Sequence, residues 1–99
     1  MTGIDFIAAE RQRQIDIGHT AGADDMQGDR LVLAAVCYAM PDKIRSARIW
    51  DTSVFSRIWP WRYGSWKPST DNRVMELAKA GALIAAEIDR LQRLAEKSF

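Results

Sequence analysis

Residues 70–96 read TDNRVMELAKAGALIAAEIDRLQRLAE, and this stretch decides the fold. Its apolar side chains recur every three or four residues, which is the repeat of an amphipathic α-helix. The positions concerned are Val74, Leu77, Ala78, Gly81, Ile84, Ala85, Ile88 and Leu91. At 1.5 Å per residue, a helix of roughly 25 residues spans about 37 Å. We expect its N-cap at Ser69, Thr70 or Asp71 and, because the other predicted helices are shorter, its far end to contact a second subunit.

A second helix is predicted over residues 3–15, at the N-terminus. Thr2 and Asp5 form a capping box, in which each side chain satisfies a free backbone N–H group at the start of the helix. One face of this helix is expected to pack on the rest of the protein. That face would hold Ile4, Ile7, Ala8, the aliphatic part of Arg11, and Ile15.

A third helix is predicted over residues 27–40, after a loop at 16–27 that is rich in Gly, Asp and Thr. The helix ends before Pro41, because proline disfavours helical geometry in the residue before it. Its run 31–39, LVLAAVCYA, is apolar nearly all round. We therefore expect this helix to be central, with neighbours on several sides.

The connection between these last two helices, residues 41–69, is long, basic and rich in tryptophan. All four tryptophans lie in it, and from Lys43 to Lys67 it has six basic side chains and one acidic side chain. A short helix is predicted near 43–50. So long a connection with little regular structure is uncommon in a compact domain and is often functional. The chain is thus predicted to be one all-α domain, residues 1–99, with three main helices.

The composition is that of a folding globular chain, with 47% hydrophobic and 27% charged residues and a net charge of +1. Chains of this length are often stabilised by self-association, so we expect a homo-oligomer. The N-terminus does not have the pattern of a signal peptide, and no apolar run approaches the length of a membrane span. A cytoplasmic protein without a membrane partner is expected. Cys37 has no partner for an internal disulfide and is expected to be buried and inert.

The basic, aromatic composition of the connection indicates an anionic ligand with an aromatic group. Indole faces can stack nucleobases, at about 1–3 kcal/mol per base, while neighbouring cations and a helix N-terminus bind phosphates. The alternative is that the tryptophans anchor an irregular segment on the helices and that the basic side chains are merely solvated. The candidate ligand-binding residues are Arg11, His19, Arg57, Trp59, Trp61, Arg62, Trp66, Lys67 and Arg73.

A magnesium site is the alternative chemistry, because Mg²⁺ prefers oxygen ligands from carboxylates. Glu10, Asp25, Asp29 and Glu87 are its candidate ligands. Asp25 and Asp29 are four residues apart, so they can share a helix face. No Glu-x-x-Glu motif occurs in the chain, and a single histidine excludes multi-histidine sites. We therefore expect no cofactor and no catalytic residue, with Mg²⁺ required only if the protein is an enzyme.

Several stretches of the sequence together resemble one family. They are Glu10-Arg11-Gln12-Arg13-Gln14, Asp24-Asp25, LAAVCYA at 33–39, WPW at 59–61, WKP at 66–68 and KAGALIAAEIDRL at 79–91. In combination they resemble small bacteriophage and prophage proteins that are labelled as similar to the N-terminal domain of a dATP/dGTP diphosphohydrolase. The resemblance covers most of the chain. It implies kinship to all-α nucleotide pyrophosphohydrolases, whose Mg²⁺ site uses a Glu-x-x-Glu helix and a further acidic pair.

Because that helix motif is absent here, we predict a small phage-type oligomer that binds and sequesters a nucleotide without hydrolysing it. By analogy with other small phage proteins, a cyclic signalling nucleotide of host antiviral defence is one candidate ligand beside linear nucleotides, and the expected location is the cytoplasm of the infected bacterium. No long nucleic acid is expected as a partner. Two alternatives remain: a Mg²⁺-dependent nucleoside triphosphate pyrophosphohydrolase, and a protein-binding module that uses the tryptophan-rich connection as a hot spot.

Overall fold

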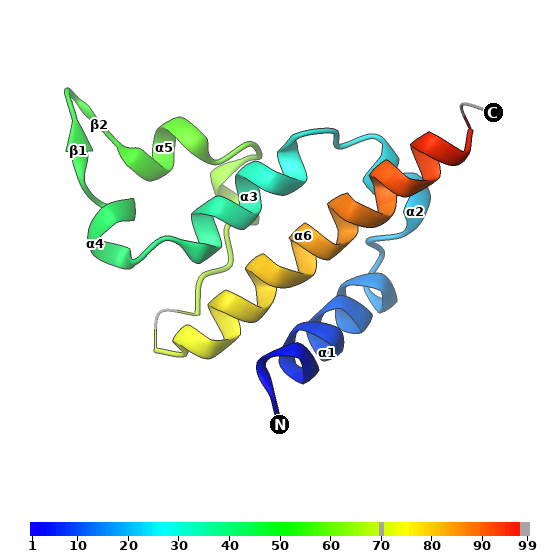
Figure 1. Ribbon diagram of the computed structural model, residues 1–99. Helices are drawn as coiled ribbons and strands as arrows, with labels where there is room; N and C mark the ends of the chain where they lie inside the picture. The colour runs from blue at the N-terminus through cyan, green and yellow to red at the C-terminus, as the bar shows by residue number, and fades with distance from the viewer. Residues whose placement is uncertain (70, 98–99) are drawn as a thin grey trace.

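The structure, a computed structural model, describes residues 1–69 and 71–97, and it is mostly helical (Figure 1). In chain order the elements are α1 (Gly3–Asp16), α2 (Ala21–Asp25), α3 (Arg30–Ala39), α4 (Asp42–Arg45), β1 (Arg48–Ile49), β2 (Thr52–Ser53), α5 (Val54–Ile58), the 3-10 turn η1 (Tyr63–Ser65) and α6 (Arg73–Glu96). The prediction of a helical fold is confirmed. The finer description as three helices is incomplete, because short helices and a two-stranded hairpin occupy the connections.

The central element is α6, with α3 along one side and α1 along the other (Figure 1). The prediction that the helix at 27–40 would be central is therefore wrong. That helix begins only at Arg30, as α3, and packs one face on α6 and α5. Its opposite face, with Val32, Leu33 and Val36, remains partly open to solvent. An all-apolar sequence therefore does not mean that α3 is surrounded within one chain.

The start of α1 is as predicted, but the face that it buries is not. The capping box is present, with the Asp5 N–H donating to Thr2 Oγ1 at 3.2 Å. The buried residues of α1 are Glu10 and Gln14, whereas Ile4 is 79% exposed. The physical reason is that this face of α1 borders a pocket that is partly polar, described below. The hydrophobic packing prediction for α1 is thus wrong at most of its apolar positions.

Short polar residues cap the helices that follow. In α6 the N-cap is Asn72, whose Oδ1 accepts the Met75 N–H at 3.1 Å, so the caps expected at Ser69 or Asp71 are wrong. The third candidate, Thr70, lies outside the described residues. The predicted loop at 16–27 contains α2, because Thr20 Oγ1 accepts the Ala23 N–H and starts a helical turn.

The tryptophan-rich connection is more regular than predicted. The expected helix near 43–50 ends at Arg45, and an antiparallel hairpin follows, with Ile49 paired to Thr52 and a turn at Trp50. The Arg45 side chain is buried, where it donates to the Cys37 carbonyl at 3.1 Å and forms an ion pair with Glu76 at 3.3 Å. The connection is thereby fastened to both α3 and α6. No described helix is both long and apolar enough to cross a membrane.

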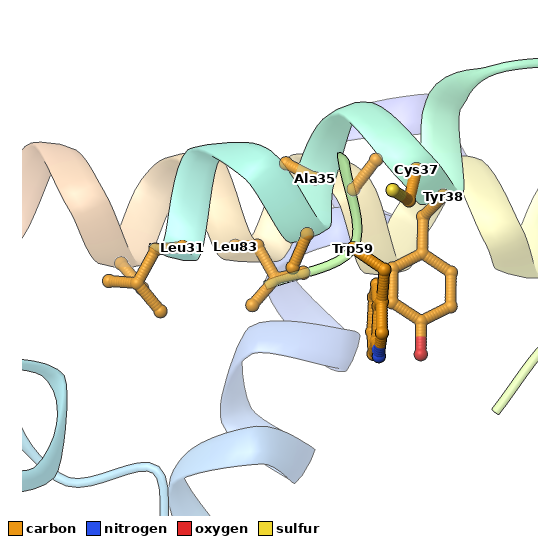
Figure 2. Close-up of a cluster of buried hydrophobic side chains, with 9 residues drawn as sticks. Leu31, Ala35, Cys37, Tyr38, Trp59 and Leu83 are labelled. Atoms are coloured by element: carbon orange, nitrogen blue, oxygen red, sulfur yellow. The ribbon is translucent and has the colours of Figure 1, made fainter. Parts of the chain in front are cut away.

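The hydrophobic core lies where α3, α6 and the connection meet (Figure 2). Cys37 is fully buried in it, as predicted, in a cluster that also includes Leu31, Ala35, Leu83 and Trp59. Burial raises the pKa of its thiol from 9.0 to about 11, against a smaller opposing effect of the Arg45 charge. A neutral, enclosed thiol has little thiolate to react.

We expect Cys37 of the native protein to resist iodoacetamide at neutral pH and to react quickly once urea unfolds the chain. The raised pKa also means that burial of the neutral thiol stabilises the fold below pH 9, and that this contribution is lost as the pH rises through about 11. Mass spectrometry of the alkylated protein measures the first effect, with a short unstructured cysteine peptide as the control. Native labelling as fast as that of the peptide would contradict the burial of Cys37.

Candidate functional site

A pocket of about 670 Å³ opens between α1, the loop around α2, α3, α6 and the tryptophan-rich connection. Its volume is within the range of small-molecule sites in proteins, about 300–1,000 Å³. Five segments that are far apart in the sequence contribute to its walls. The pocket therefore exists only in the folded chain, and its walls combine aromatic, charged and amide side chains.

One wall is aromatic and already ordered. The Trp59 and Trp61 rings meet edge to face with centroids 5.4 Å apart, and Tyr38 meets Trp59 in the same manner at 5.8 Å, side by side in Figure 2. Trp61 Nε1 donates to Gln27 Oε1 at 2.8 Å, which fixes the ring without a ligand. Trp59 is buried and stacked on Phe55, whereas Trp61 is only half-buried. Trp61 is thus the indole with surface left for a ligand.

The Tyr38 hydroxyl belongs to the same wall. Burial raises its pKa, and the hydrogen bond that it accepts from the Lys67 N–H, at 3.3 Å, lowers it by less. The hydroxyl therefore stays neutral around pH 7. It serves the pocket as an uncharged polar group and does not act as a base.

The facing wall is the polar side of α1. Arg13 forms two hydrogen bonds to the buried Glu10 carboxylate, at 2.9 and 2.5 Å, and hydrogen bonding to Glu10 is the main reason why the pKa of Arg13 is raised. Gln14 is buried one turn further along, and its Oε1 has no hydrogen-bond partner. A buried acceptor without a donor costs roughly 1–3 kcal/mol. Gln14 is also part of the pocket lining, so its unpaired Oε1 is a candidate acceptor for an N–H or O–H group of a ligand.

Two lysines provide positive charge in the pocket. Lys79 Nζ donates to the Lys67 carbonyl at 2.8 Å and to Ser69 Oγ at 3.2 Å, and it lies 5.5 Å from the centre of the Tyr38 ring. An ammonium group has three N–H donors, so one donor remains for a ligand oxygen. The Lys67 side chain also lines the pocket and is exposed. An anionic group is expected to bind between these two lysines.

The pocket includes four of the nine ligand-binding residues predicted from the sequence. His19, Trp59, Trp61 and Lys67 all line it. Of the other five, Arg57 and Arg62 are exposed and do not line it. The structure therefore brings four of the nine predicted residues together in one cavity.

Three predicted residues have structural partners instead of a place in the pocket. Arg73 donates to the Tyr38 and Met40 carbonyls at 3.0 and 3.1 Å, so it caps the free carbonyl groups at the end of α3. Trp66 packs against Tyr38 and lies under the Arg45 guanidinium. Arg11 pairs with Asp24 at 3.4 Å and Asp89 at 3.6 Å. These pairings could not be read from positions in the sequence.

The four carboxylates of the predicted magnesium site are not brought together. Glu10 binds Arg13, Glu87 binds Arg90 at 2.7 Å, and Asp25 binds Arg93 at 2.8 Å, which lowers the pKa of Asp25. Asp29 is exposed at the start of α3. Within residues 1–69 and 71–97, no group of three or more His, Cys, Asp or Glu side chains has the geometry of a metal site. The residues described here do not fit the metal centre of a pyrophosphohydrolase.

Sequence reasoning did not assign several residues that line the pocket: Arg13, Gln14, Gln27, Tyr38 and Lys79. One signal was available for α1. Glu10 and Gln14 are four residues apart, and Ile7 precedes Glu10 by three, so all three share a helix face. A buried face that changes from apolar to polar along its length is typical of a helix that forms the wall of a site.

Comparison with known proteins gives no assignment. No family model matches the chain, and no curated protein or solved structure is significantly similar to it. The function therefore has to be inferred from the chemistry of the pocket.

Proposed function

We propose that the pocket binds a nucleotide and that the protein sequesters it without hydrolysis. The observation that supports this is the combination of three groups in one cavity. These are the half-buried indole of Trp61, the unpaired Oε1 of Gln14, and the Lys79 ammonium with a donor to spare. A nucleotide offers a flat base, an N–H group on that base and phosphate oxygens, and so complements all three.

In this proposal the base lies against Trp61, and Gln14 Oε1 accepts from its edge. The phosphates lie towards Lys67 and Lys79, whose ammonium groups would donate charge-assisted hydrogen bonds to them. Such bonds are shorter and stronger than neutral ones. Arg57, Arg62 and Arg73 take no part, since the pocket does not include them. The indole is held before binding by Gln27, so little ordering of the aromatic wall opposes binding.

The carboxylates favour binding over turnover. Glu10 and Asp24 line the pocket, but arginine side chains hold both: Arg13 binds Glu10, and Arg11 binds Asp24. Hydrolysis of a nucleoside triphosphate through Mg²⁺ needs carboxylate oxygens that are free to bind the metal. A binding protein needs none. Sequestration also agrees with the analogy to other small phage proteins that bind signalling nucleotides, and a cyclic signalling nucleotide is included among the candidate ligands.

The test is isothermal titration calorimetry with nucleoside mono-, di- and triphosphates and cyclic dinucleotides, together with an assay for pyrophosphate release in the presence of Mg²⁺. We expect binding and no release. Lys79→Ala should weaken binding about ten- to a hundredfold, because the variant loses one charge-assisted hydrogen bond to the ligand. Arg57→Ala, an exposed cation outside the pocket, is the matched control and should bind like the wild type.

Gln14→Leu separates a binding role from a folding role. The variant removes a buried acceptor without a partner, so its thermal stability should equal or exceed that of the wild type, while its nucleotide affinity falls. If no nucleotide binds, the proposal is wrong. Release of pyrophosphate that depends on Mg²⁺ would favour the pyrophosphohydrolase instead.

The hairpin favours a second function, binding of another protein. Trp50 is 90% exposed at the turn between β1 and β2, where the hairpin extends away from the three long helices (Figure 1), and it adopts a φ of 61° that side chains rarely take. Exposed tryptophans are frequent hot spots of protein interfaces. Capture of a host protein that is lost with Trp50→Ala but kept with Lys79→Ala would support this function.

A further inference from the structure

The longest helix has an apolar face that stays open to solvent. On α6, Val74, Leu77, Ile84, Ile88 and Leu91 are each 47–54% exposed. Together with Gly81 these positions are separated by three, four, three, four and three residues, the heptad spacing of a helix that packs against another helix. The Ile7 side chain of α1 lies over Gly81, so the open part of this face is formed by the five exposed residues, which we call the α6 seam. No charged side chain interrupts it over its length of about 26 Å.

The molecule also has more surface than a monomer of its size should have. A folded monomer of 11.2 kDa is expected to expose about 5,700 Å², and this chain exposes 6522 Å². The excess of about 800 Å² equals the area that one partner contributes to an interface of standard size. The radius of gyration is 14.3 Å, against about 12.6 Å expected for a compact chain of this length.

The shape explains where this surface comes from. The extents are 46 × 33 × 19 Å, so the molecule is flat, and α6 lies between α1 and α3 in this slab (Figure 1). A second layer of helices would be needed to cover the α6 seam. The described part of the chain provides no such layer.

We propose that the α6 seam packs against the α6 seam of a second copy of this chain. The spacing of the seam, with Gly81 included, reads the same in both directions along the helix, so an antiparallel copy is in register with it. In that arrangement Val74 faces Leu91, Leu77 faces Ile88, and Ile84 faces the Ile7 side chain that lies over Gly81. A two-fold axis generates this pairing from one self-complementary surface, which is the commonest symmetry of protein oligomers.

Sedimentation velocity of the 99-residue chain tests the proposal. We expect a dimer, or a larger assembly built from it, and Ile84→Glu should raise the dimer dissociation constant at least about thirtyfold, the effect of losing one interface hot spot. Because Ile84 is half exposed, the glutamate head group can reach water in the monomer. The circular dichroism spectrum of the Ile84→Glu variant should therefore match that of the wild type. Val36→Glu, an equally apolar and similarly exposed position on α3, should leave the assembly intact.

Chemical cross-linking gives a second measurement that does not depend on a destabilising charge. An Ile84→Cys variant should be linked into dimers by a short bis-maleimide, whereas Val36→Cys should not, and the native Cys37 is buried and silent. A wild-type monomer would overturn the proposal. So would an assembly that Val36→Glu dissociates and Ile84→Glu does not, or a different protein bound to the seam of a monomer.

Discussion

Glu76→Ala is expected to lower the free energy of unfolding by about 3–5 kcal/mol, because it leaves the Arg45 charge buried without its partner. Both side chains are almost completely enclosed, and the Arg45 Nη2 atom lies 3.3–3.4 Å from the two Glu76 oxygens. A domain of this length is stable by about 5–15 kcal/mol in total. One substitution would therefore remove a large part of the stability.

Urea denaturation followed by circular dichroism measures this effect. Asp42→Ala is the control, because Asp42 also contacts Arg45, at 3.6 Å, but its side chain is 80% exposed. Exposed ion pairs contribute about 0–1 kcal/mol, so this variant should be close to the wild type. The double variant Arg45→Met with Glu76→Leu removes both charges and should recover most of the loss. A Glu76→Ala protein as stable as Asp42→Ala would refute the role assigned to the pair.

The two partners of Glu76 show which contacts one sequence can predict and which it cannot. Arg73 and Glu76 are three residues apart on α6, which in a sequence indicates a weak surface pair. In the structure Glu76 is buried, and its second partner, Arg45, is 31 residues away. The helical repeat is a local property, whereas this contact depends on how the connection folds back over α3 and α6. Only the local part can be predicted from one sequence.

The candidate site likewise contains some residues that the sequence predicts and others that only the packing of the chain explains. His19, Trp59, Trp61 and Lys67 were predicted from residue type, since aromatic and basic side chains near a helix start suit an anionic ligand. Arg73 satisfies the same criteria but instead binds the carbonyl groups at the end of α3. Residue type indicates what a side chain can bind. Which groups reach a common cavity is decided by packing, and for α1 that packing buried Gln14 and exposed Ile4.

Trp59→Ala should destabilise the fold by about 3–5 kcal/mol, the usual cost of deleting a large aromatic side chain from a core. Trp59 is 7% exposed, stacks on Phe55 with ring centroids 5.6 Å apart, and meets Trp66 at 5.0 Å. Trp50→Ala is the matched control, because the Trp50 ring is 90% exposed and exposed substitutions usually change stability by less than about 0.5 kcal/mol.

Thermal and urea unfolding of the two variants therefore separate the tryptophans into anchors and surface groups. A mild effect of Trp59→Ala would contradict its place in the core. The difference also decides which substitution can test the pocket. Loss of binding in Trp59→Ala would follow from the damaged core, whereas Trp61 is half-buried, and its ring is held by one hydrogen bond to Gln27. Trp61→Phe should keep the fold and a stacking face, so a nucleotide that stacks on Trp61 should still bind to it, more weakly than to the wild type.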